Sequence, residues 1–201
     1  MERMRSASAV ILLLLLAFSA TWTSATLAVT VKDSPGYYEI PDPESMSVRI
    51  GRRLNAPIVH QPFKGGTKSL DDLGRAVCWT LHHTDHDSLL KLCITDHEFQ
   101  EILWREFPQS RPATGLQWDD AWKILYARMH AGCMHAMRDL GGHPYRFLRV
   151  EADSIAVYKN FKLYSQLRLV TKDDTGQIQE WRWLRAVAER KGRFKIYSTE
   201  D

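Results

Sequence analysis

The fold class of this chain is decided by the stretch Ile178-Gln-Glu-Trp-Arg-Trp-Leu-Arg-Ala-Val-Ala-Glu-Arg-Lys-Gly-Arg-Phe-Lys-Ile-Tyr-Ser-Thr199. Apolar and polar residues alternate along most of it, which is typical of strands with one buried face. Lys191-Gly192 interrupts the alternation as a two-residue turn would, and Asp173-Asp-Thr-Gly176 precedes it as a loop with a left-handed glycine. The sequence therefore predicts antiparallel strands joined by short turns, at about 145–151, 155–172, 178–189 and 193–199.

The two turns also predict how these strands pair. The 173–176 loop sets Leu169 opposite Trp181 and Leu163 opposite Val187, and the 191–192 turn sets Val187 opposite Ile196. Both registers place the same apolar side chains on one face. They are Leu163, Leu167, Leu169, Trp181, Trp183, Val187, Phe194 and Ile196. A slip of one residue would scatter them over both faces, so their agreement favours this register.

Polar side chains interrupt that apolar face in its middle, where the register sets Ser165, Arg185 and Ser198 side by side. An arginine on a buried face is costly unless it is paired or hydrated. Either a cavity that holds water or a ligand opens here, or the sheet extends beyond the helices that cover it and Arg185 is exposed to solvent. The first interpretation makes Ser165, Trp183, Arg185 and Ser198 the candidate ligand-binding residues. Arg185 would then donate charge-assisted hydrogen bonds to an anionic or carbonyl group of a small-molecule ligand.

The opposite face of the predicted sheet carries a small apolar and aromatic patch. Its residues are Tyr164, Leu184, Ala186 and Tyr197, with charged residues around them. Aromatic centres with polar rims are typical of protein interfaces. We interpret the patch as the face of a homodimer. The alternative is that a helix, or the segment 32–68, covers it within one chain.

Helical patterns precede the strands. Ser69 and Asp85 can cap a first and a second helix, and Thr95-Asp-His-Glu98 is a capping box that opens a third. A fourth helix is predicted from about 117 to 140 by apolar residues at every third or fourth position, and Gly141-Gly142 would end it. Helices followed by antiparallel strands predict an α+β domain.

Two stretches make this domain similar to a known superfamily. One runs from Leu70 to Asp85 and is followed by Ser88-Leu-Leu-Lys-Leu; the other is the last hairpin, Val187 to Tyr197. Together they resemble the nuclear transport factor 2-like superfamily, or cystatin-like cone fold, over residues 69–201. In the hairpin this sequence has Phe194 where many relatives have tryptophan.

The resemblance implies N-terminal helices packed in the concave face of a curved antiparallel sheet, with a pocket inside the cone. Members include isomerases, dehydratases, polyketide cyclases and non-enzymatic binding or association modules. No position of this sequence matches a catalytic motif of the family, so the resemblance implies no catalytic residue.

The N-terminus has the composition of a secretory signal. Arg3 and Arg5 precede an apolar run, and small residues follow it. We therefore expect residues 1–28 to be a signal peptide and the protein to be exported, to a periplasm or outside the cell. If the segment is not cleaved, residues 6–31 would anchor the protein in a membrane. Residues 29–68 contain five prolines and are predicted to be an irregular leader or linker.

Charge and residue types exclude several functions. The formal net charge is +3, which is too balanced for the basic surface that nucleic-acid binding usually needs. Cys78, Cys93 and Cys133 lie among apolar residues and are interpreted as buried, with a Cys78–Cys93 bridge as the alternative.

Two loose histidine clusters offer no third ligand at a recognisable spacing. His82 and His86 are four residues apart, but Asp85 is expected to start a new helix between them. His135 points away from the apolar stripe that holds Cys133 and, beside it, His130. The sequence predicts no metal site and no cofactor.

Spacing reveals neither a Ser-His-Asp or Cys-His arrangement nor a glycine-rich phosphate loop. The sequence thus predicts an exported small-molecule-binding or association module. The alternative is an isomerase, dehydratase or cyclase that uses the same pocket.

Overall fold

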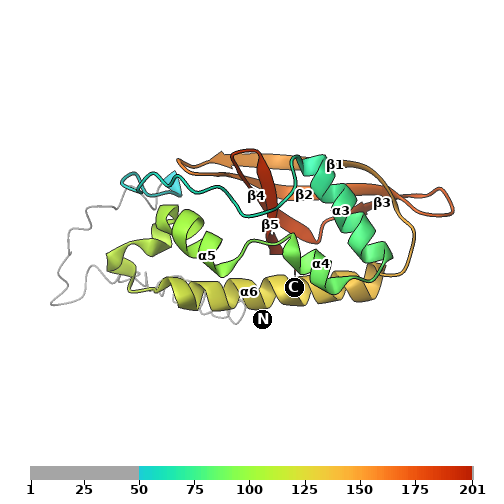
Figure 1. Ribbon diagram of the computed structural model, residues 1–201, viewed down its shortest axis with the longest axis horizontal. Coiled ribbons are helices and arrows are strands. Elements are labelled where there is room, and N and C mark those ends of the chain that lie inside the picture. Colours follow the sequence, from blue (N-terminus) through green and yellow to red (C-terminus); the bar gives the residue numbers. More distant parts are fainter. Residues whose placement is uncertain (1–49, 201) are drawn as a thin grey trace, which may run out of the picture. The chain divides into compact units, whose positions relative to one another are not determined.

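The computed structural model describes residues 50–200, all within one compact unit, Asp42–Asp201 (Figure 1). The predicted signal peptide at 1–28, the alternative anchor at 6–31 and most of the predicted leader lie outside the described residues. None of the helices in residues 50–200 has the length and apolar character that crossing a membrane requires.

The helices form where their caps predict them. Helix α3 spans Leu70–His82, α4 His86–Lys91, α5 Asp96–Glu98 and α6 Trp118–Leu140. Ser69 Oγ accepts the amide of Asp72 at 3.0 Å and caps α3. The capping box of α5 is complete, because Thr95 Oγ1 accepts the Glu98 amide while the Glu98 carboxylate accepts the Thr95 amide at 2.9 Å. Shorter turns continue α5: η2 (Phe99–Leu103), η3 (Trp104–Glu106), η4 (Pro108–Ser110) and η5 (Pro112–Thr114).

The strands build a curved, unclosed, antiparallel five-stranded sheet in the order β1-β2-β4-β5, with β3 also paired to β2. Their bounds are β1 Arg146–Val157, β2 Lys162–Lys172, β3 Ile178–Trp181, β4 Leu184–Arg190 and β5 Arg193–Thr199. The α+β class is confirmed. The predicted boundary between the first two strands is wrong, because β1 continues to Val157 and the chain turns where the Tyr158 amide donates to the Phe161 carbonyl.

The predicted register holds next to each turn and fails in between. Leu169 faces Trp181 and Val187 faces Ile196, as predicted. Leu163, however, faces Ala188 instead of Val187. Gln166 adopts a left-handed φ of 56° in β2, and further register shifts flank Ala186 in β4. Each extra residue exchanges the two faces of a strand, so the predicted single apolar face is divided.

Two groups of buried side chains result. The first core cluster packs α3, α4 and α6 against the sheet. Its members are Leu73, Val77, Cys78, Leu81, Leu89, Cys93, Met129, Cys133, Ala136, Leu167, Leu169, Trp181, Leu184, Val187 and Ile196. The second core cluster lies round α5 and η2. Its members are Phe63, Ile94, Phe99, Ile102, Leu103, Phe161 and Ala188. Figure 1 shows β4 and β5 between α3 and α5, and the long helix α6 extends past both α3 and α5.

Strand β4 is therefore covered on both faces, which removes the predicted outer patch. Leu184 and Ala186 are only 2% and 6% exposed. Tyr164 packs against the first core cluster and Tyr197 against the second, so the four residues share no exposed surface. The chain covers this patch itself, as the alternative interpretation expected. A homodimer stays a prediction, but these four residues do not offer it an exposed face.

Residues 50–68 contribute to this cover. Ala56 and Phe63 are buried, and the Arg190 guanidinium donates hydrogen bonds to the carbonyls of Val59, Gln61 and Asn160. The Asn160 side chain also binds the Pro57 carbonyl and the Val59 amide, at 2.9 and 2.8 Å. The domain boundary at residue 68 stays a prediction, and residues 50–68 pack on the strands beyond it.

Candidate functional site

The structure does not bring the predicted ligand-binding residues into one site. The Arg185 side chain is 59% exposed, and its Nη2 pairs with Glu200 Oε1 at 2.6 Å. The interpretation that Arg185 lies inside the domain is therefore wrong. The register shifts in β4 are the reason: Ala186 takes the predicted place of Arg185 and faces both Ser165 and Ser198.

Trp183 lies elsewhere, half-buried beside a cavity of about 330 Å³ that it shares with Arg182 and His135. Its indole N–H is buried and has no hydrogen-bond partner in the described part of the chain. Ligand binding by Ser165, Trp183, Arg185 and Ser198 stays a prediction. Its geometric basis, a shared interior, is absent from the described residues.

A different cavity, of about 470 Å³, opens beside the second core cluster. We call it the aromatic pocket. Its aromatic lining residues are Phe99, Trp104, Phe107, Tyr158 and Tyr197, and Ala121 and Leu125 of α6 line its other side. Its volume lies in the range of about 300–1,000 Å³ that is usual for small-molecule sites. Sequence reasoning missed it, although the aromatic residues in 99–107 were a signal.

The rings of the pocket hold one another in place. Phe107 contacts Tyr158 edge-on at 5.7 Å between ring centroids and lies 5.9 Å from the Tyr197 ring. The ring centroids of Phe99 and Trp104, which also line the pocket, lie 5.8 Å apart. Such contacts restrict the rotamers of the lining, which favours a preformed site over one that collapses when empty.

Tyr158 and Tyr197 contribute hydroxyls to the lining of the pocket, which also includes Gln109. Burial raises the pKa of Tyr197, and burial together with the negative charge of Glu106 raises the pKa of Tyr158. Both phenols thus stay protonated near neutral pH and can donate a hydrogen bond. No hydrogen bond of either hydroxyl is found among residues 50–200, and both tyrosines line the pocket.

Buried Glu106 fixes the wall that carries Tyr158. Its two carboxylate oxygens accept the amides of Lys159 and Asn160 at 2.7 and 2.6 Å. Its carbonyl accepts the Arg53 amide at 2.8 Å. Through its side chain and its backbone carbonyl, this one residue ties η3 to the turn after β1 and to residues 50–68, which fixes the backbone beside Tyr158.

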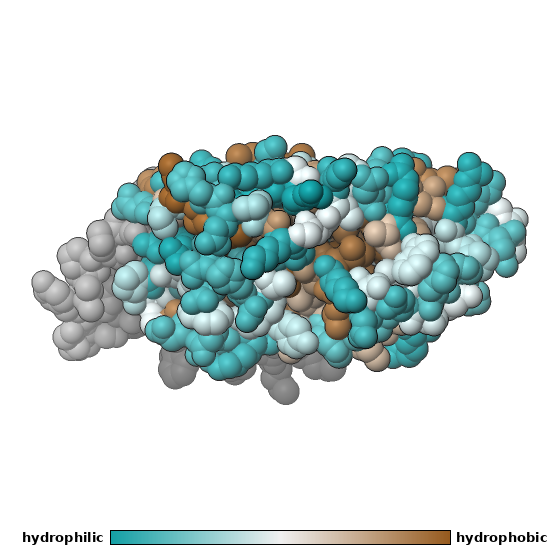
Figure 2. Space-filling model, viewed as in Figure 1, coloured by the Kyte–Doolittle hydropathy of each residue, from teal (hydrophilic) through white to brown (hydrophobic). Residues whose placement is uncertain are grey.

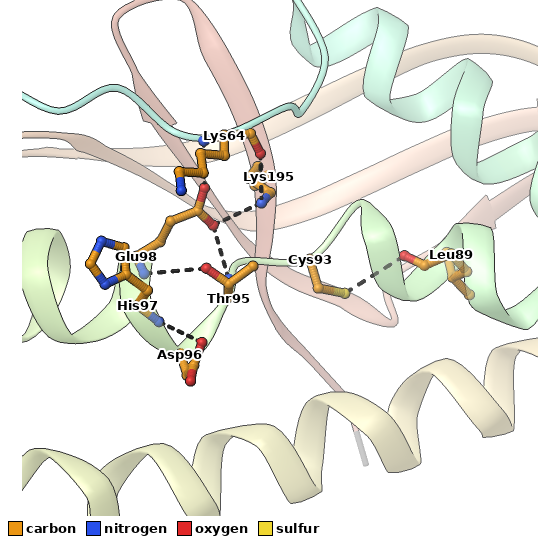
Figure 3. Close-up of polar contacts among 8 residues, drawn as sticks. All are labelled: Lys64, Leu89, Cys93, Thr95, Asp96, His97, Glu98 and Lys195. Atoms are coloured by element: carbon orange, nitrogen blue, oxygen red, sulfur yellow. Dashed lines mark hydrogen bonds and ion pairs between the residues drawn. The ribbon is translucent and has the colours of Figure 1, made fainter.

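A buried ion pair fixes the neighbouring wall (Figure 3). Lys195 Nζ lies 2.7 Å from Glu98 Oε2, and both side chains are almost fully buried, at 2% and 3% exposed. Glu98 also accepts the amides of Lys64 and Thr95, at 2.7 and 2.9 Å. Glu98 directly precedes Phe99 in the sequence, and Lys195 lies two residues before Tyr197 in β5. Because each carboxylate oxygen has its partners, we assign the pair a structural role.

A close backbone approach accompanies this pair. Gly66 has a left-handed φ of 74°, and a Cβ there would lie 2.8 Å from both Lys195 Cγ and the Phe194 carbonyl oxygen. A glycine is therefore required at residue 66.

Potential metal ligands do not gather in the described residues, where no group of three or more histidine, cysteine or acidic side chains could hold an ion. His86 and His130 come from the two separate clusters of the sequence, and their rings meet edge-on at 5.1 Å. His82 contacts the ring of His83 instead.

The three cysteines are buried and free, so the Cys78–Cys93 bridge does not form in the structure. Burial raises the pKa of the Cys78 thiol to about 12. A hydrogen bond to Cys133, and then burial, raise the pKa of Cys93. The thiols of Cys78 and Cys93 are therefore poor nucleophiles, which agrees with their interpretation as core residues.

Comparison with protein-family models, curated proteins and solved structures finds no match to this chain. The geometry of the aromatic pocket is therefore the main guide to function.

Proposed function

We propose that this protein is an exported small-molecule-binding module that takes a flat, largely apolar ligand in the aromatic pocket. The observation that carries the proposal is a cavity of about 470 Å³ lined by five aromatic side chains, two of which are tyrosines. A planar ligand would stack on the rings. A carbonyl or ether oxygen of the ligand would accept a hydrogen bond from Tyr158 or Tyr197.

The chemistry of the lining favours binding over the alternative of an isomerase, dehydratase or cyclase. Acid–base catalysis near neutral pH needs a carboxylate or imidazole within reach of the substrate. The described lining residues include neither, and the raised pKa values of Tyr158 and Tyr197 keep these phenols protonated near neutral pH, so neither offers a phenolate base. The carboxylate of Glu106 is occupied by two backbone amides.

The proposed membership of the nuclear transport factor 2-like superfamily is consistent with this function. A curved antiparallel sheet with helices before it, and a pocket between them, is what that resemblance implies. Since the same fold hosts enzymes and binding modules, the fold supports the presence of a pocket and not the choice of its ligand.

Filling the pocket tests the proposal. Ala121 lines it from α6, and Ala127 lies on the exposed side of the same helix. Coumarin, a planar lactone, serves as the probe in an NMR titration, with an expected Kd on the order of 0.1–1 mM for a ligand of this size. Ala121→Phe should weaken coumarin binding at least about tenfold, whereas the control Ala127→Phe should leave it unchanged.

The proposal fails if coumarin and other planar carbonyl compounds do not bind at millimolar concentration. It also fails if Ala121→Phe folds normally and binds coumarin as the wild type does.

A further inference from the structure

A second cavity, of about 600 Å³, lies between α3 and the strand ends that carry the β2–β3 hairpin. We call it the rim cleft. It shares no lining residue with the aromatic pocket. In Figure 1, α3 and this hairpin lie at the right, and the segments round α5 lie at the left. Figure 2 shows the same face of the molecule, where apolar side chains surface among hydrophilic ones.

The floor of the rim cleft is apolar and partly open. Trp79 of α3 is 53% exposed, which is unusual for so large an apolar side chain, and its ring stacks on His83 at 4.3 Å. Phe147 of β1 lies beside it under the Arg75 guanidinium, 5.1 Å from the ring centroid. A concave, exposed aromatic surface of this kind is characteristic of ligand sites.

Two cations face each other at the edge of this floor. Arg146 of β1 is directly opposite Lys172 of β2 in the antiparallel ladder. Like charges in that position destabilise a sheet. No acidic partner is found for either side chain within residues 50–200. Other cations of the same strands are paired: Arg149 with Glu151 at 2.5 Å, and Arg168 with Asp153 at 2.8 Å.

Acidic side chains of the hairpin also line the cleft but leave these cations unpaired. The Asp173 carboxylate is held by Thr175, by the Gln177 amide at 2.8 Å and by Gln179. These bonds, that of Thr175 first, lower the pKa of Asp173 and keep it ionised. Asp174 is exposed on the same rim.

We propose that the rim cleft binds an organic anion with a planar apolar body, such as an aromatic carboxylate. The anionic group lies between Arg146 and Lys172 and removes the repulsion between them. The planar body lies on Trp79 and Phe147. This site is independent of the aromatic pocket and of the function proposed for that pocket.

A matched pair of probes tests the proposal. The probes are 1-naphthoate and its neutral analogue 1-naphthamide. The binding of each is measured by titration, from the shift of the NMR signal of the Trp79 indole N–H. Naphthoate should bind at least about tenfold more tightly than the amide, because only the carboxylate accepts charge-assisted hydrogen bonds. The double variant Arg146→Gln/Lys172→Gln should lose this preference.

Three further variants separate a site from a general charge effect. Arg149→Gln removes one positive charge from the same strand and should leave naphthoate affinity unchanged. Asp174→Asn should increase the affinity about two- to threefold, since it removes a like charge near the anion. Ala121→Phe, which fills the aromatic pocket, should have no effect on naphthoate.

Ligand-free stability gives a second measurement. Arg146→Gln should keep or slightly raise Tm, because it relieves the repulsion with Lys172. Equal affinity for naphthoate and naphthamide, binding that survives the double variant, or binding abolished by Ala121→Phe would each overturn the proposal. So would the absence of naphthoate binding at millimolar concentration.

Discussion

The first core cluster is filled mainly by aliphatic and sulfur-containing side chains, whereas the second is built round aromatic rings and has buried charges at its border. In the first, Leu81, Leu89 and Val187 are completely buried. In the second, Phe161 is buried, whereas Phe99, Phe107 and Tyr197 line a cavity. The buried side chains of Glu98, Lys195 and Glu106 lie at the border of this second region.

The difference teaches how one small domain can combine a filled core with a pocket. Aliphatic side chains interdigitate and leave little space, so the first core cluster stabilises the fold through burial. Rigid rings leave gaps that cannot collapse when the backbone behind them is fixed. Glu98 and Glu106 provide that fixation, because each holds backbone amides from a distant segment.

We expect the largest loss of stability when one of these buried carboxylates is removed. Glu98→Ala would leave the Lys195 ammonium buried without its counter-ion and remove the acceptor of the Lys64 and Thr95 amides. We expect a loss of about 4 kcal/mol in the free energy of unfolding, measured by urea denaturation. Glu101→Ala, which removes a more exposed carboxylate from the adjacent turn, serves as the control. A loss for Glu98→Ala no larger than the control's would contradict the role given to the pair.

A matched pair of leucines compares the packing of the two regions directly. Leu81→Ala removes a fully buried side chain from the first core cluster, and we expect a cost of about 3 kcal/mol. Leu125→Ala removes a half-buried side chain that already borders the aromatic pocket, and we expect about 1 kcal/mol. Equal costs in chemical denaturation would mean that the pocket wall is packed as tightly as the first core cluster.

Alkaline pH should weaken the first core cluster through Cys78. Its pKa is raised from 9.0 to about 12 by burial, so the folded state keeps the thiol protonated. The stabilisation is fully present below pH 9.0 and is lost as the pH rises toward 12, because the unfolded state releases its proton first. We expect a loss of about 1 kcal/mol by pH 10. In Cys78→Ala this part of the pH dependence should disappear; an unchanged slope would show that the thiol is not protected.

We expect the smallest change in stability when a hydroxyl of the aromatic pocket is removed. Tyr197→Phe removes a hydroxyl that has no hydrogen-bond partner in residues 50–200, so stability should change by less than about 0.5 kcal/mol. Coumarin affinity should nevertheless fall about three- to tenfold, since the ligand loses a donor. The control is Tyr126→Phe, on the exposed side of α6. A large loss of stability in Tyr197→Phe would mean that the hydroxyl serves the fold and not a ligand.

Much of the local structure was determined by short sequence signals. Ser69, Asp85 and Thr95 cap the helices that they predict, and each does so through a residue three positions further on. Gly176 and the Lys191-Gly192 turn adopt the left-handed conformations expected of them. Such signals are readable from sequence because both the cause and its effect lie within a few residues.

The tertiary structure alone decided which side chains of each strand are buried against the helices and which are exposed to solvent. A left-handed Gln166 and the irregular pairing round Ala186 shift the register by one residue, which exposes Arg185 and buries Leu184. Alternation predicts that a strand has two different faces, but it does not predict where an extra residue exchanges them.

The aromatic pocket likewise depends on contacts between segments that are far apart in the sequence. Phe99, Leu125, Tyr158 and Tyr197 come from four separate segments of the chain, and no spacing between them is visible in the sequence. Sequence alone determined an α+β domain with helices before an antiparallel sheet. The sites were decided by the packing of distant segments, because a pocket is a gap between elements and no single element contains it.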